Sequence, residues 1–218
     1  MQNLEITRAG VIVGEGGGDE AFFRYLCDVR GINGFQYFGA GGVDNYEGFL
    51  KSLPKMTGFS RLCKVLIVVG DNDDAIDASW TKIRKYIKNA KLPTPNEPLK
   101  MAKHSTGDLE VYGMMIPFDD QQNRYKGCLE TLLLKAVQDN KPELAKCIKP
   151  FSDCLKMEET VTNGSHLDKF RLRAILAAAF PDDPNFALQW ALSPKHGVMP
   201  LNHAAFDGIE QFLRTITL

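Results

Sequence analysis

Two short stretches of the sequence place carboxylates directly after an apolar run. In GVIVGEGGGDEAFF three glycines separate Glu15 from Asp19, and in GDNDDA the residues Asp71 and Asp73 follow the run VLIVV. Carboxylates that cluster repel one another and raise one another's pKa unless a cation offsets their charge. Carboxylate oxygens are hard ligands that suit Mg²⁺ or Mn²⁺. We therefore expect a divalent metal site formed by Glu15, Asp19, Asp71 and Asp73.

Each stretch also has an alternative interpretation. The glycines partly match the dinucleotide-binding fingerprint G-x-G-x-x-G, but Asp19 stands where the third glycine belongs, and Glu15 would repel a pyrophosphate. Asp19 and Glu20 also favour the positive N-terminus of a helix. The residues from Asp71 to Asp74 could form a turn that caps a helix. The metal site is favoured because Glu15 and the second acidic stretch are expected at one edge of the same sheet.

A further acid, Glu130, shares a helical face with Leu133, Leu134 and Val137. An acid on an apolar face needs a partner. Glu130 therefore reaches the metal site, accepts a structural hydrogen bond from a backbone N–H, or stays exposed in the first turn of its helix. The sequence leaves these three possibilities open.

The elements that must position these acids follow from short apolar runs. Runs of β-branched residues that end at glycine and acid are typical of buried parallel strands. The predicted strands span residues 8–15, 35–38, 62–70 and 111–117, and the predicted helices between and after them include residues 22–29, 46–53 and 75–89. This alternation predicts an α/β fold with a mostly parallel sheet flanked by helices. Ligands bind beyond the carboxyl ends of such strands, so Glu15 and Asp71 are expected to meet there.

After Lys126 the sequence pattern becomes helical. Helices are expected at residues 127–135, 167–180 and 206–216, separated by loops that contain proline. No further strand pattern is convincing. We predict an α/β domain over residues 1–125 and a helical C-terminal extension over residues 126–218, packed on the same core.

The composition indicates a globular protein with local binding sites. The chain has 218 residues and a net charge of −1, so it does not bind nucleic acid through overall charge. No apolar run is long enough to span a membrane, and the N-terminus lacks the basic and apolar regions of a signal peptide, so a cytoplasmic location is expected. The oligomeric state is not predicted.

The cysteines and one tryptophan are expected to have structural roles. The five cysteines are scattered without a C-x-x-C pair, which argues against a disulfide framework and a zinc site and favours small buried hydrophobic residues. Trp190 lies in an apolar context, where core packing is favoured over stacking on a nucleic-acid base.

One predicted helix is locally basic. Within residues 81–91, Lys82, Lys85 and Lys88 recur every three residues. This spacing predicts either a local site for a polyanion or an ordinary solvated helix face, and the solvated face is the simpler interpretation.

The arrangement of the acids resembles the Toprim domain, over about residues 8–120. A glutamate at the end of the first strand and an Asp-x-Asp after the third strand match its signature acids at Glu15, Asp71 and Asp73. The spacing Glu15-x-x-x-Asp19 and the later Glu130 are most similar to the nuclease branch of the family, which includes the overcoming-lysogenization-defect nucleases. The G-x-L-E motif that ends at Glu130 is similar to that of small stand-alone Toprim-type proteins related to these nucleases. The resemblance implies a Toprim/Rossmann-like sheet, Glu15 as general acid/base or metal ligand, and Asp71 and Asp73 as ligands of Mg²⁺ (or Mn²⁺). It implies that Asp19 and Glu130 support a second ion.

The expected function is Mg²⁺-dependent hydrolysis of nucleic-acid phosphodiesters, by a nuclease or a component of one, with DNA or RNA as partner. Two metals about 4 Å apart would activate water and stabilise the leaving oxygen. Lys126 and Lys195 are the nearest candidates to neutralise the transition state, although a surface role is favoured for both. One alternative is a non-catalytic module that binds a nucleotide or a partner protein. Another is a different Mg²⁺ enzyme with a D-x-D motif, such as a glycosyltransferase or phosphatase.

Overall fold

The computed structural model describes residues 5–161 and 164–218, so residues 1–4 of the predicted first domain lie outside the described part. Its centre is a five-stranded sheet with the order β2-β1-β3-β5-β4. All neighbouring strands are parallel except β4 and β5, so the predicted mostly parallel α/β fold is confirmed. The strands are β1 (Gly10–Gly14), β2 (Phe35–Gly39), β3 (Val65–Asp71), β4 (Met101–Lys103) and β5 (Glu110–Ile116).

Strands β1 and β3 are neighbours, with Val13 opposite Val68, so their carboxyl ends open onto the same edge of the sheet. This is the arrangement predicted for the residues that follow the two strands. Tyr46 of α2 (Val43–Ser52) ties the strands together just before that edge. Its buried hydroxyl lies within hydrogen-bond range of the carbonyl oxygens of Val13, at 2.8 Å, and of Val69.

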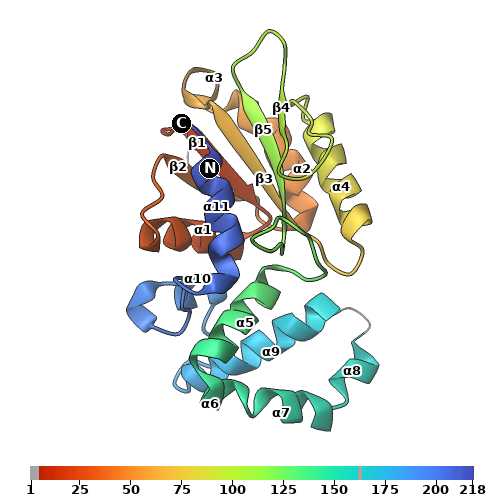
Figure 1. Ribbon diagram of the computed structural model, residues 1–218, viewed down its shortest axis with the longest axis vertical. Coiled ribbons are helices and arrows are strands. Elements are labelled where there is room, and N and C mark those ends of the chain that lie inside the picture. Colours follow the sequence, from red (N-terminus) through yellow and green to blue (C-terminus); the bar gives the residue numbers. More distant parts are fainter. Residues whose placement is uncertain (1–4, 162–163) are drawn as a thin grey trace.

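Helices cover both faces of the sheet (Figure 1). Alternate residues of β1 and β3 face opposite layers: Val13 belongs to the core under α2 and α4, whereas Ile12 belongs to the core under α1. Strands that are buried on both faces are expected to be apolar throughout, as these are. The helices of this part are α1 (Gly17–Val29), α2, a 3₁₀ turn (Leu53–Lys55), α3 (Phe59–Leu62) and α4 (Ile76–Asn89).

The predicted helical extension follows β5. Figure 1 shows α5 to α9 grouped beyond one edge of the sheet, and α11 running back along the sheet. Leu132 and Leu133 of α5, Ile175 of α9 and Phe212 of α11 belong to the same apolar core as Ile12. The division at residue 125 remains a prediction. The helices are α5 (Leu129–Asn140), α6 (Pro142–Ala145), α7 (Ile148–Cys154), α8 (Met157–Thr160), α9 (Gly164–Ala179), α10 (Leu188–Ala191) and α11 (Asp207–Thr215), with 3₁₀ turns at Pro194–His196 and Ala204–Phe206.

Some expectations differ from the structure. The short antiparallel edge strand β4 was not predicted, because its three residues are too few to carry a period. Trp190 is 58% exposed, so the prediction of core packing is wrong. Cys27, Cys63 and Cys128 are buried as predicted; the other two cysteines, Cys147 and Cys154, are exposed. In the described part of the chain no helix is long and apolar enough to cross a membrane.

Candidate metal centre

The turn from β1 into α1 brings Asp19 back toward the end of the strand. The Gly16 N–H donates to Asp19 Oδ2 at 2.8 Å, which satisfies one of the free donors at the start of the helix. Gly14 permits this approach, because a Cβ at position 14 would lie 2.3 Å from the Cβ of Asp19. Glu15 is exposed between them. The glycines therefore form the tight strand-to-helix turn that the sequence predicts.

Asp71 is the last residue of β3, and it connects the sheet to α5. Its Oδ1 accepts a hydrogen bond from the Leu129 N–H at 3.1 Å. The next residue, Asn72, is fully buried, and its amide donates to the carbonyl oxygens of Pro117 and Tyr125 at 2.7 and 2.9 Å. These bonds hold the segment after β5 against the end of β3, which places the start of α5 beside Asp71.

The backbone does not stay extended as far as Asp73. Its φ of +48° is in the left-handed region, so Asp73 does not continue the alternation of β3. Backbone hydrogen bonds in both directions with Gly127, at 2.7 and 3.0 Å, hold it in this turn. The side chains of Asp71 and Asp73 would point the same way only if the extended backbone of β3 continued to Asp73, and it does not.

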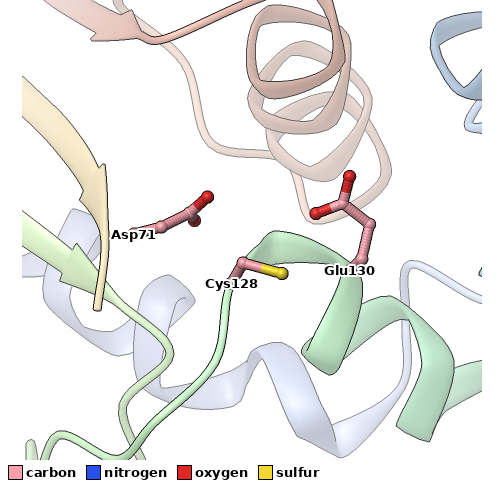
Figure 2. Close-up of side chains that lie close together, drawn as sticks. All are labelled: Asp71, Cys128 and Glu130. Carbon is pink, nitrogen blue, oxygen red and sulfur yellow. The ribbon is translucent and has the colours of Figure 1, made fainter. Parts of the chain in front are cut away.

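Figure 2 shows Asp71, Cys128 and Glu130 around a common space. One ligand atom of each, two carboxylate oxygens and the thiol sulfur, lies within 4.8 Å of the others, so the group could hold a metal ion. Glu130 is in the first turn of α5 and half-buried, and it faces Asp71. Cys128 precedes α5 and its buried thiol was not expected beside these acids, because no paired-cysteine motif marks it.

A cavity of 220 Å³ joins the acids from the three segments. Glu15, Asp19, Asp71 and Glu130 line it, whereas Asp73, which the structure also describes, lies outside the lining. Two cations of α9 and the start of α10 with the residue before it complete the lining, namely Lys169, Arg173, Ala187, Leu188 and Gln189.

The cavity lysine is Lys169, which sequence reasoning missed. Lys126 and Lys195, the candidates that the sequence suggested for neutralising the transition state, are both exposed and do not line the cavity. Lys169 lies within the helix expected at residues 167–180, but nothing in its local sequence distinguishes it from other lysines. Only the packing of α9 against α5 brings it to the acids.

The pKa values of two carboxylates in the cavity are raised because these groups are buried close to other acids. Burial raises the pKa of Asp19 to about 6, against the opposing hydrogen bond from Gly16 and with the help of the charges of Glu130 and Glu15. Burial, together with the charges of Asp19 and Glu130, raises the pKa of Asp71 well above its ordinary value of 3.8.

The same crowding acts on the cavity lysine in the opposite sense. Partial burial tends to lower the pKa of Lys169, but the charges of Glu130, Cys128 and Asp71 outweigh it and raise that pKa. The lysine therefore stays a cation beside the acids and offsets part of their charge.

These shifts predict a pH dependence of stability. Between pH 4 and 6 folded Asp19 holds a proton that the unfolded chain has released, so the free energy of unfolding falls as the pH rises through this window. We expect the melting temperature of the metal-free protein to fall less steeply with pH in Asp19→Asn than in the wild type. Thermal melts in EDTA from pH 4 to 7 measure this. Parallel curves for the two proteins would contradict the burial of an ionisable Asp19.

The donor set fits a hard divalent cation. Four carboxylates face two cations in the cavity, so negative charge is in excess, and carboxylate oxygen is the ligand type that Mg²⁺ and Mn²⁺ prefer. The thiol of Cys128 adds a softer donor at one side of the group. Burial, together with repulsion between the acids, raises the pKa of Asp19 and Asp71, and a bound cation would favour their charged forms.

Comparisons with known proteins give a family and distant structural likenesses. The model of a family described as a protein of unknown function, DUF3226, matches residues 10–218. No curated protein matches the sequence. The chain is similar to the C-terminal region of the Xanthomonas campestris pv. campestris OLD protein phased with mercury, at 13% identity and a TM-score of 0.45, over 96% of this chain and 97% of that one. For the same region phased with platinum, the identity is 14% and the TM-score 0.36, over 95% and 89% of the chains. At this level of sequence identity and TM-score, the similarity gives no information about the activity of this chain.

Proposed function

Because this chain belongs to the DUF3226 family, whose function is unknown, we propose an activity from its own site: Mg²⁺-dependent (or Mn²⁺-dependent) hydrolysis of nucleic-acid phosphodiesters by a Toprim-type centre. The protein would act as a nuclease or as a component of one. The observation that carries the proposal is the convergence of four carboxylates, from the turn after β1, the end of β3 and the start of α5, on one cavity that also contains a lysine.

The proposed roles follow from where each side chain lies. Asp71 and Glu130 face each other closely enough to share an ion, and Asp19 lines the same cavity. Asp73 adds negative charge from just outside the lining, since its charge acts on both Asp71 and Lys169. A bound divalent ion would supply Lewis-acid activation of a phosphoryl oxygen.

Glu15 and Lys169 have the positions to act on a substrate. Glu15 is the exposed carboxylate at the rim of the cavity, where it can accept a proton from an attacking water. Lys169 lines the same cavity from α9, where its ammonium can offset the negative charge that develops on the phosphate. A carboxylate base and a cation in one cavity are groups that can assist phosphodiester hydrolysis.

Incubation of the purified chain with labelled single- and double-stranded DNA and RNA tests the proposal. We expect cleavage with Mg²⁺ or Mn²⁺, none in EDTA, and a loss of cleavage in Glu15→Gln. Glu20→Gln, two positions beyond Gly18 on the same turn but outside the cavity lining, is the matched control and should cleave normally. Intact substrates under every metal condition, together with an absence of metal binding by calorimetry, would favour a non-catalytic nucleotide- or partner-binding module.

A further inference from the structure

Helix α4 exposes a dense group of cations. Between Thr81 and Asn89 it carries Lys82, Arg84, Lys85 and Lys88, all exposed, and no carboxylate. Its apolar residues, Trp80, Ile83 and Ile87, are buried against the sheet, so the helical period leaves the cations on the outer face. In a chain of net charge −1, this face is a local excess of positive charge.

Three of these cations line a hollow on α4, and further cations line a second hollow that includes the end of α4. The first has a volume of 530 Å³ and is lined by Arg84, Lys85 and Lys88 together with Trp80, Thr81 and Thr94. The second, also of 530 Å³, begins at Asn89 and is lined by Lys51, Lys55, Lys91 and His104 over an apolar floor. No carboxylate is among the residues described as lining either hollow. We call the exposed cations of α4 together with the cations of the second hollow the α4 track.

The carboxylates around the α4 track offset only part of its charge. Glu47 pairs with Lys51, accepts a hydrogen bond from the Asn89 side chain at 3.0 Å, and also interacts with the charge of Lys85. Asp108 lies between Lys64 and Lys103, at 3.6 and 4.0 Å. Helix α4 also carries Asp77 in its first turn, where it pairs with Arg124, so the four cations further along the helix keep a net positive face.

Helix α4 starts near the candidate metal centre, and the cations of the α4 track follow along it. Helix α4 begins at Ile76, five positions after Asp71, and Figure 1 shows it running along the sheet from the edge that faces the helical extension. With a rise of 1.5 Å per residue, Lys82 lies about 9 Å and Lys88 about 18 Å along the helix from Ile76. A polyanion that reaches the centre can therefore continue along the helix.

We propose that the α4 track binds the phosphate backbone of the nucleic acid that the centre acts on, a proposal that rests on the function proposed above. Regularly spaced phosphates match a row of cations along a rigid helix. An anionic membrane fits the surface less well, because a helix that inserts into a membrane interface needs exposed apolar side chains. The large apolar side chains that the structure describes as exposed lie elsewhere than on α4.

Binding without cleavage tests the α4 track. The full chain is titrated, in EDTA and over a series of salt concentrations, into fluorescent 20-base-pair DNA and RNA duplexes. In Lys82→Gln/Lys85→Gln/Lys88→Gln the affinity should fall at least tenfold near 0.1 M salt, and the slope of log affinity against log salt should become shallower by about 2 to 3, because three phosphate contacts are lost. The matched control, Lys146→Gln/Lys149→Gln/Lys156→Gln on the exposed extension, has the same change in charge and should bind as the wild type does.

Three outcomes would overturn the proposal: no binding by the wild type, equal losses in the two triple variants, or wild-type binding to phosphatidylserine vesicles but not to either duplex. Melting temperatures of both variants show whether they are folded. The nuclease proposal is tested separately with Mg²⁺ present. If binding depends on the α4 cations but no cleavage occurs, the nuclease proposal is contradicted and the proposed role of the α4 track stands. If cleavage occurs but the triple variant of α4 has the salt slope of the wild type, the nuclease proposal stands and the role of the track is contradicted.

Discussion

Asp71→Asn is expected to abolish metal-dependent cleavage and at the same time to raise the melting temperature of the metal-free protein. Asp71 is held beside Asp19 and Glu130, and burial with these charges raises its pKa well above the ordinary value. An amide removes the repulsion but keeps an oxygen that can accept the Leu129 N–H. Each kcal/mol of relieved repulsion raises the melting temperature of a chain of this size by roughly 2–4 °C.

The loss of cleavage follows from the same change. An amide oxygen is a much weaker ligand for a hard cation than a carboxylate, so we expect a decrease in kcat/KM on the order of 10³-fold, comparable to removal of one preorganised electrostatic group. Calorimetry with Mg²⁺ and thermal melts in EDTA measure the two effects separately.

Asp119→Asn is a suitable control for Asp71→Asn. Hydrogen bonds from the Asn123 backbone lower the pKa of Asp119, aided by the Asn123 side chain and the Gln121 N–H. The same chemical change should therefore lower the melting temperature there and leave cleavage intact. A fall in the melting temperature of metal-free Asp71→Asn would show that its carboxylate is not under the repulsion described.

Lys169→Met is expected to slow cleavage by about 10²- to 10³-fold while strengthening the binding of Mg²⁺. The ammonium offsets the acids of the cavity, so its removal makes the site more negative and more attractive to a cation. It also removes the positive charge that would face a phosphate. A variant that binds the metal more tightly but reacts more slowly separates a role toward the substrate from a merely structural one.

The controls for Lys169 come from the two lysines that the sequence suggested. Lys126→Met and Lys195→Met change exposed residues outside the cavity and should leave both metal affinity and kcat unchanged. Lys169→Arg, which keeps the charge, should recover part of the rate. Equal cleavage rates for Lys169→Met and the wild type would show that Lys169 has no role in the reaction.

Local sequence patterns were sufficient to predict the parallel strands of the sheet and the common edge at which two of them end in acids. The runs after Arg8 and Lys64 are apolar at every position, which is typical of strands buried on both faces, and parallel neighbours present their carboxyl ends at one edge. Glu15 and Asp71 therefore line one cavity although they are far apart in the chain. The position of Asp19 near the end of β1 was predicted from the glycine-rich turn that follows the strand.

The other residues of the site are positioned by contacts between segments that are distant in the chain. Short sequence patterns contain no information about such contacts. Asp73 leaves the strand because Gly127 pairs with its backbone, and Cys128 and Lys169 reach the acids because α5 and α9 pack beyond the edge of the sheet. The basic spacing of α4 is visible in the sequence, but the tertiary structure decides that Lys51 and Lys55 line a hollow together with the end of that helix. Periodicity specifies which face of an element is buried, whereas the neighbour of that face is specified only when the whole core is packed.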